Sequence, residues 1–248
     1  MAVGKEFTLR GKAGYDISCI EWPCERERAT LVCLHGFAGD KYSSVIRALG
    51  EALAQRSVRT VAFDWPGHGK SPVDGASLTV ENCLLDLDSV LREIQKTGRP
   101  VYLFATSFGG FVGLNYMALH PAAFSKAALR SPALDMPKTY RSLLTDGELR
   151  TLENGGTVNK GFDRPLLLGK SFLEDLDRRR IPRDAYPADV PGLILQGDRD
   201  DVVNPLDSAA FAERNGLRLH MVKGADHRYK NKGDLEEILS VTIRFLLD

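Results

Sequence analysis

A serine in a very short connection between two predicted elements is the first candidate for chemistry. Ser107 follows an apolar run at residues 101–104 that predicts a strand, and an amphipathic run beginning at 111 predicts a helix. The chain must therefore turn sharply at Ser107, and small residues are needed two positions away. Ala105 and Gly109 satisfy this requirement, Ala105 in place of the glycine of the G-x-S-x-G pattern. Such a turn exposes a serine hydroxyl as a nucleophile; the alternative is a serine that only caps the helix.

A nucleophilic serine needs a histidine that accepts its proton and a carboxylate that orients the histidine. His227 lies in a glycine-containing loop after a predicted strand at 217–222. Three acidic residues follow the preceding predicted strand, at 192–196: Asp198, Asp200 and Asp201. Each of these residues alone is more typical of a solvated loop or a helix cap. Their order along the chain, serine before acid before histidine, is that of the α/β-hydrolase triad and favours one common site.

A glycine-rich turn is a further candidate. Residues 35–39 read His-Gly-Phe-Ala-Gly and follow a continuous apolar run at 30–34, which is typical of a strand buried on both faces. Such a turn can direct backbone N–H groups at the oxygen of an attacked carbonyl as that oxygen becomes negatively charged. The alternative is that the glycines only allow the chain to turn.

Strand and helix patterns alternate along most of the chain. Apolar runs predict strands at 5–10 and 15–22, joined as a hairpin, and at 30–34, 58–63, 101–104, 127–130, 192–196 and 217–222. Periodicity predicts helices at 42–56, 79–96 (with Leu84, Leu85 and Leu87 on the buried side), 111 to Pro121, 206–215 and 235–247. This alternation predicts an α/β fold with a mostly parallel sheet covered on both faces. Because function gathers at the carboxyl ends of strands in such sheets, the candidate segments should lie at one edge.

The alternation is interrupted once, between residues 133 and 186. This segment is too long for a plain connection and mixes charged residues with apolar ones such as Leu143, Phe162 and Phe172. We therefore predict one α/β domain over 1–248 with an inserted cap at about 133–186. The cap should cover the mouth of the site and select among substrates; the alternative is an insertion that only enlarges the surface.

Composition narrows the function classes. The chain has 248 residues, 43% of them hydrophobic, and 33 basic residues balance 33 acidic ones. This balance does not favour nucleic acid or an anionic membrane surface as the main partner. The N-terminus lacks a signal-like apolar region and no stretch approaches a membrane span, so a cytoplasmic protein is expected. Four cysteines lack zinc-ligand spacing, and reduced thiols without a metal site are expected: Cys19, Cys24, Cys33 and Cys83.

Taken together, these motifs resemble the α/β-hydrolase family over nearly the whole chain. The matching residues are the turn at 35–37, the elbow, the loop at 64–71, the glycine and acid at 197 and 200, and the Gly-Ala-x-His ending at 227. The family's spacing places the acid three residues after the glycine and so implies Asp200. It also implies the backbone N–H groups of Phe37 and Phe108 as the oxyanion hole. The 35–41 segment and the end of the insertion are similar to small cinnamoyl and feruloyl esterases.

The resemblance implies a serine hydrolase acting on a small-molecule carboxylic ester, with Ser107, His227 and Asp200 as the catalytic triad. It implies an acyl-enzyme intermediate and no cofactor. An acyl thioesterase or a monoacylglycerol-type lipase would use the same residues. A catalytically silent α/β-hydrolase fold that only binds a ligand is the alternative of another class, and the intact triad argues against it. The acyl and alcohol groups and the oligomeric state are not predicted.

Overall fold

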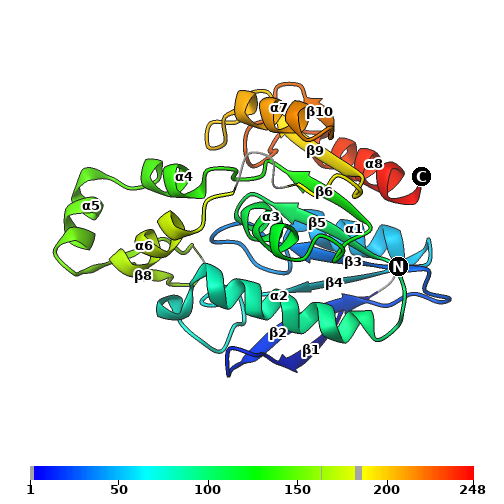
Figure 1. Cartoon of the computed structure of the whole chain (residues 1–248), viewed down its shortest axis with the longest axis horizontal. Helices are drawn as coiled ribbons and strands as arrows, with labels where there is room; N and C mark the ends of the chain where they lie inside the picture. Colours follow the sequence, from blue (N-terminus) through cyan, green and yellow to red (C-terminus); the bar gives the residue numbers. More distant parts are fainter. Residues whose placement is uncertain (1–2, 163, 182–185) are drawn as a thin grey trace.

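A single eight-stranded sheet runs through the molecule (Figure 1). The computed structural model describes residues 3–162, 164–181 and 186–248, so residues 1–2 of the N-terminus and 163 and 182–185 of the expected cap lie outside the described residues. The strands are β1 (Lys5–Arg10), β2 (Asp16–Trp22), β3 (Ala29–Leu34), β4 (Val58–Phe63), β5 (Val101–Thr106), β6 (Lys126–Arg130), β9 (Gly192–Gly197) and β10 (Arg218–Val222). Their order across the sheet is β1-β2-β4-β3-β5-β6-β9-β10. Strand β2 pairs antiparallel with β1 and β4, and every other pair is parallel.

Helices cover both faces of this sheet, which confirms the predicted α/β arrangement. Helices α1 (Ser44–Ala54) and α8 (Asp234–Leu247) share one apolar core, and α2 (Val80–Gln95), α3 (Phe108–Leu119) and α7 (Pro205–Arg214) belong to the other. Along β3, Leu31 and Cys33 face the first core while Val32 and Leu34 face the second. All six residues of β3 are buried, as expected for a strand between two helical layers.

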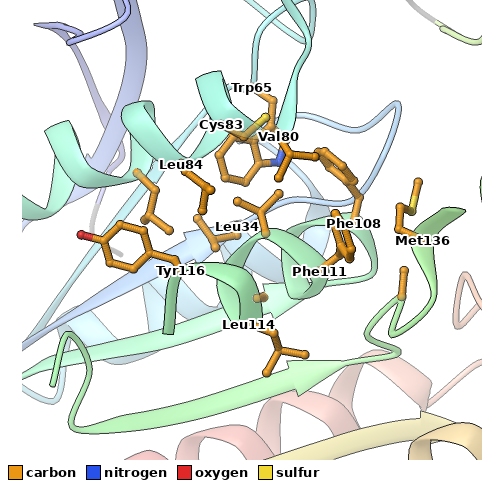
Figure 2. Close-up of a cluster of buried hydrophobic side chains, with 14 of the residues drawn as sticks. Leu34, Trp65, Val80, Cys83, Leu84, Phe108, Phe111, Leu114, Tyr116 and Met136 are labelled. Atoms are coloured by element: carbon orange, nitrogen blue, oxygen red, sulfur yellow. The ribbon is translucent and has the colours of Figure 1, made fainter. Parts of the chain in front are cut away.

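The core on the α2 and α3 side supports the turn that carries Ser107. Figure 2 shows side chains of α2 and α3 gathered around Leu34 and Trp65, with Phe108 and Phe111 at the start of α3. Helix α3 is apolar nearly all round because it lies between the sheet, α2 and the insertion. The burial prediction for α2 is wrong in one detail: Leu85 is only half-buried, and the carboxyl group of Asp86 is buried instead.

The segment between β6 and β9, called the insertion below, forms a small layer of its own beyond the end of β6 (left in Figure 1). It contains α4 (Met136–Ser142), α5 (Asp146–Glu153), the antiparallel pair β7 (Thr157–Asn159) and β8 (Leu167–Gly169), and α6 (Lys170–Arg178). Its buried side chains continue the core on the α2 and α3 side. The guanidinium of Arg164 also donates hydrogen bonds to the carbonyls of Ser71 and Val73, at 2.6 and 2.8 Å, so the insertion is attached to the loop after β4.

Candidate active site

Ser107 occupies the sharp turn between β5 and α3. Its φ is 50°, in the left-handed region that non-glycine residues rarely adopt. The side chain of Ser107 makes no capping hydrogen bond to α3, so the helix-cap alternative does not describe its hydroxyl. Gly109 lies where strand and helix approach: a Cβ there would stand 2.5 Å from the carbonyl oxygen of Leu34. The crossing is therefore close enough to exclude any side chain at this position.

The structure brings the three triad candidates together. Ser107 Oγ lies 3.1 Å from His227 Nε2, and His227 Nδ1 lies 2.8 and 3.0 Å from the two carboxylate oxygens of Asp200. With Nδ1–H donating to Asp200, Nε2 of His227 is free to accept the Ser107 proton. The three residues follow β5, β9 and β10, so they meet at the carboxyl end of the sheet, as predicted for this topology.

Asp200 is surrounded by donors. Its side chain is fully buried and accepts the N–H groups of Val202 and Val203 and the amide of Gln196, at 2.9, 2.8 and 2.9 Å. Burial alone would raise the pKa of Asp200, but the hydrogen bonds and charge of His227 and the two N–H groups outweigh it and hold the pKa below its usual value. Asp198 instead accepts the N–H of Gly224 at 2.6 Å, away from the histidine.

The 35–39 turn lies beside Ser107. A Cβ added to Gly36 would stand 3.5 Å from the Cβ of Ser107, so the turn passes close to the serine. The backbone N–H groups of Phe37 and Phe108 donate no hydrogen bond to any group in the part of the chain that the structure describes. Two free N–H groups next to a candidate nucleophile are what an oxyanion hole requires.

Two buried histidines hold this turn. Nε2 of His68 accepts the N–H of Ala38 at 3.1 Å, and Nε2 of His35 accepts the N–H of Trp65 at 3.2 Å. Burial lowers the pKa of both imidazoles, to about 3 for His68. Both rings are therefore neutral near pH 7, which leaves Nε2 able to accept. The sequence motifs gave no role to His68; its contact with Ala38 across 30 residues is a product of the fold.

A cavity of about 560 Å³ opens beside Ser107. Its wall comprises residues 36–39 of the turn, 43–45 at the start of α1, Thr106, Ser107, Arg130, Met136, Thr139, Leu143, residues 159–162, Val202, His227 and Arg228. The insertion thus contributes a large part of the wall, much of it apolar. Among these described lining residues none is acidic, whereas three are cationic: Arg130, Lys160 and Arg228.

The described residues contain no cluster of three or more His, Cys, Asp or Glu side chains arranged to hold a metal ion. No helix in the described ranges is both long enough and apolar enough to cross a membrane. The thiols of Cys19, Cys24, Cys33 and Cys83 are all free.

Two curated proteins are similar to this chain over part of their length. The chain is 29% identical over 166 residues to proline iminopeptidase PfmaB of Pestalotiopsis fici (64% of this chain, 55% of the relative), and 24% identical over 195 residues to the mitochondrial palmitoyl-protein thioesterase ABHD10 of Pongo abelii (76% and 63%). The chain spans between 22% and 63% of the length of the curated relatives it matches.

Among solved structures, Est1E of Butyrivibrio proteoclasticus with ferulic acid bound superposes with a TM-score of 0.82 at 20% identity, over 98% of this chain and 100% of Est1E. This likeness shows a common α/β-hydrolase fold. The family model described as "Serine aminopeptidase, S33" matches residues 25–154, more than half of the chain. The chain therefore belongs to this family of α/β-hydrolase-fold serine hydrolases.

Proposed function

We propose that this serine hydrolase cleaves carboxylic esters with Ser107 as nucleophile, His227 as general base and Asp200 as the residue that orients His227. The observation that carries the proposal is the continuous hydrogen-bonded chain from Ser107 Oγ through His227 to Asp200 at the wall of an open cavity. A side chain used only for structure has no need of a strained turn that exposes its hydroxyl beside an imidazole.

The reaction follows from this arrangement. His227 Nε2 takes the proton of Ser107 as Oγ attacks the ester carbonyl, and the negative charge on the carbonyl oxygen is stabilised by the N–H groups of Phe37 and Phe108. The bond to the alkoxy oxygen then breaks, and the alcohol leaves with the proton from His227. Water, deprotonated by His227, then attacks the acyl carbon; the bond from that carbon to Ser107 Oγ breaks, and His227 returns the proton to Oγ as the carboxylic acid leaves. Throughout, the carboxylate of Asp200 stabilises the imidazolium.

The charge of the cavity wall favours an ester over an aminopeptidase substrate. Recognition of a free N-terminal ammonium group needs a carboxylate or several carbonyl acceptors in the pocket. The described lining residues include no acidic side chain and three cationic ones. An ammonium group would therefore find no carboxylate partner among these described lining residues, although the name of the matched family and that of PfmaB refer to peptidases.

A thioesterase is the second candidate, favoured by the similarity to the thioesterase ABHD10 and by the apolar part of the wall that includes Met136 and Leu143. Thioesters would react through the same residues. The relative turnover of an ester and a thioester would distinguish the two candidates.

The test begins with a fluorophosphonate probe, which labels an activated serine. We expect labelling of the wild type and none of Ser107→Ala, together with a loss of ester turnover of at least about three orders of magnitude in the variant. Substrates would be p-nitrophenyl acetate, butyrate and octanoate, methyl ferulate, an acyl-CoA and an amino-acid p-nitroanilide. A p-nitroanilide turned over faster than every ester would refute the ester proposal, and an acyl-CoA turned over faster would favour the thioesterase.

A further inference from the structure

Two polar side chains stand in register at the ends of the two central strands. Thr106 of β5 pairs with Arg130 of β6, and both line the cavity beside Ser107. Two residues earlier on each strand, Phe104 and Ala128 belong to the core packed by α1 and α8. Because side chains alternate along a strand, Thr106 and Arg130 point to that same side. The cavity therefore has an arm on the α1 side of the sheet.

Each of these half-buried side chains has one buried polar atom without the partner that burial normally requires. Nε of Arg130 and Oγ1 of Thr106 are shielded from solvent, and neither makes a hydrogen bond to any group of the described chain. An unpaired buried donor on a cation is costly, and native proteins rarely keep one without a function. Both residues line the cavity, so a small rotation of each side chain toward it would let a ligand group accept hydrogen bonds from both and remove this cost.

The guanidinium of Arg130 is held in place but is not neutralised. It stacks on the ring of Tyr229, with 4.3 Å from Cζ to the ring centroid, which leaves its N–H edge free to donate. Burial lowers the pKa of Arg130, and the charges of the Asp200, Asp226 and Asp234 carboxylates offset that effect only in part. None of these groups accepts a hydrogen bond from the guanidinium.

The first turn of α1 lines the same cavity, through residues 43–45. The N-cap residue Ser43 makes no side-chain capping bond, and the first turn contains no acidic residue. The N-terminus of an eleven-residue helix carries a partial positive charge and unused N–H donors. The helix terminus and Arg130 thus favour the same kind of ligand, one that is negatively charged.

We propose that this anion arm, formed by Thr106, Arg130 and the first turn of α1, binds a carboxylate carried by the ester substrate. The planar fork of Arg130 matches two carboxylate oxygens, and Thr106 and the helix N–H groups supply further donors. The preferred substrate is then an ester that carries a free carboxylate. Examples are a half-ester of a dicarboxylic acid and a hydroxybenzoic acid acylated on its phenol oxygen. This inference rests on the proposed esterase function and specifies its substrate.

The experiment compares esters that differ only in the charged group. Monomethyl adipate is paired with methyl adipamate, in which a primary amide replaces the carboxylate, to place the charge on the acyl side. The compounds 4-carboxyphenyl butyrate and 4-carbamoylphenyl butyrate place it on the alcohol side. We expect the ratio of kcat/KM, acid over amide, to exceed about 10 for at least one pair, and Arg130→Gln to lower that ratio by about 10- to 100-fold.

Arg228→Gln is the matched control, since Arg228 lines the cavity too but stacks on the exposed Phe162, with 5.2 Å from Cζ to the ring centroid. Its ratio should change less than about threefold, as expected for a solvated charge. A wild-type ratio at or below one for both pairs overturns the inference. A ratio that falls in Arg228→Gln but not in Arg130→Gln also overturns the inference, because the preference for the acid would then come from Arg228.

A binding measurement covers the case in which Arg130→Gln does not fold or the esterase function fails. Adipate should raise the Tm of the wild type, and adipamide at the same concentration should not; Thr106→Val, which keeps the side-chain shape, should reduce the shift. Equal shifts with adipate and adipamide, or no shift, would contradict the anion arm. Absence of both fluorophosphonate labelling and turnover of the amide esters would instead contradict the proposed esterase.

Discussion

Three acidic residues lie within the four positions after β9, and they differ in burial and in hydrogen-bond partners. Asp200 is buried against His227, whereas Asp198 accepts the N–H of Gly224 and closes the loop that carries the histidine. Asp201 is exposed, and the ring nitrogens of His227 pair with Asp200 and Ser107 instead. Of the three carboxylates, only that of Asp200 lies within hydrogen-bond distance of the imidazole.

We therefore expect Asp200→Asn to lower kcat by about three to four orders of magnitude, because an amide at this position favours the wrong tautomer of His227. Asp198→Asn and Asp201→Asn are the matched controls and should cost less than about tenfold. Steady-state kinetics with p-nitrophenyl butyrate, beside Tm values that report folding, would measure this. A larger loss in Asp201→Asn than in Asp200→Asn would show that another carboxylate orients the histidine.

The three residues that form the hydrogen-bonded chain could be predicted because each belongs to a local sequence pattern. Ser107 lies in a strand-to-helix turn. The α/β-hydrolase spacing, with the acid three residues after the glycine, distinguishes Asp200 from its neighbours. Arg130 and Thr106 could not be predicted as an anion site in this way. Arg130 stacks on the ring of Tyr229, which lies 99 positions later in the sequence, so this contact exists only in the folded chain.

At the scale of the elements, the crossing of β3 and α3 determines how close Ser107 comes to the 35–39 turn. A Cβ at Gly109 would meet backbone oxygens at 2.5 and 2.7 Å, from Leu34 and His35. Backbone in a central strand cannot move aside as the end of a flexible side chain can. The close approach is therefore fixed by the sheet itself.

Gly109→Ala should destabilise the fold by at least about 3 kcal/mol and lower Tm by roughly 6 °C or more, since the added methyl group overlaps backbone atoms. Gly147→Ala is the control: a Cβ there meets nothing closer than Thr145 Oγ1 at 3.9 Å, and the change in α5 should raise Tm by roughly 1–4 °C. The Tm values of both variants, from thermal unfolding, would test this prediction. An unchanged Tm in Gly109→Ala would mean that α3 is able to shift away from β3.

Helix α2 carries a buried carboxyl group whose ionisation opposes folding. Burial raises the pKa of Asp86 to about 7, an effect that its hydrogen bond from Tyr15 only partly offsets. In the unfolded chain the pKa returns to its ordinary value near 4. The folded state therefore holds the proton more tightly, and the contribution of Asp86 to stability falls as pH rises from about 4 through 7.

Asp86→Asn should remove this loss, so the variant should gain most over the wild type at about pH 8 and distinctly less at about pH 5. The upper bound of the gain is about 4 kcal/mol. Asp88→Asn serves as the control on the same helix: hydrogen bonds from Lys12 and Tyr116 outweigh burial and lower the pKa of Asp88, so its loss should destabilise at about pH 8. Equal Tm differences at both pH values in Asp86→Asn would contradict a raised pKa.

At the scale of the whole molecule, the alternation of strands and helices is enough to predict the sheet, because both of its faces must be buried. The arrangement of the insertion could not be predicted from its mixed composition. Its aromatic side chains Tyr140 and Phe172 pack on Phe37, with ring centroids 5.5 and 6.0 Å apart. Shortening the insertion would therefore disturb the candidate oxyanion hole as well as the substrate pocket, and single substitutions are the sharper test of substrate selection.

Leu143, at the end of α4, lines the cavity and is 40% exposed there. A medium-length acyl chain in the cavity would cover this side chain, whereas an acetyl group is too small to need it. Leu143→Ala should therefore lower kcat/KM for p-nitrophenyl octanoate by about 5- to 20-fold relative to p-nitrophenyl acetate, the loss expected for a few methylene contacts.

Leu167→Ala is the matched control, because Leu167 also lies in the insertion, is 51% exposed and does not line the cavity. The ratio of octanoate to acetate turnover should stay within about twofold of the wild type in this variant, since an exposed apolar side chain away from the pocket contributes little to substrate binding. A fall of equal size in both variants would indicate a general loosening of the insertion. An unchanged ratio in Leu143→Ala would mean that the acyl chain leaves the cavity on another side, and selection among esters would then belong to the walls formed by the sheet and α1.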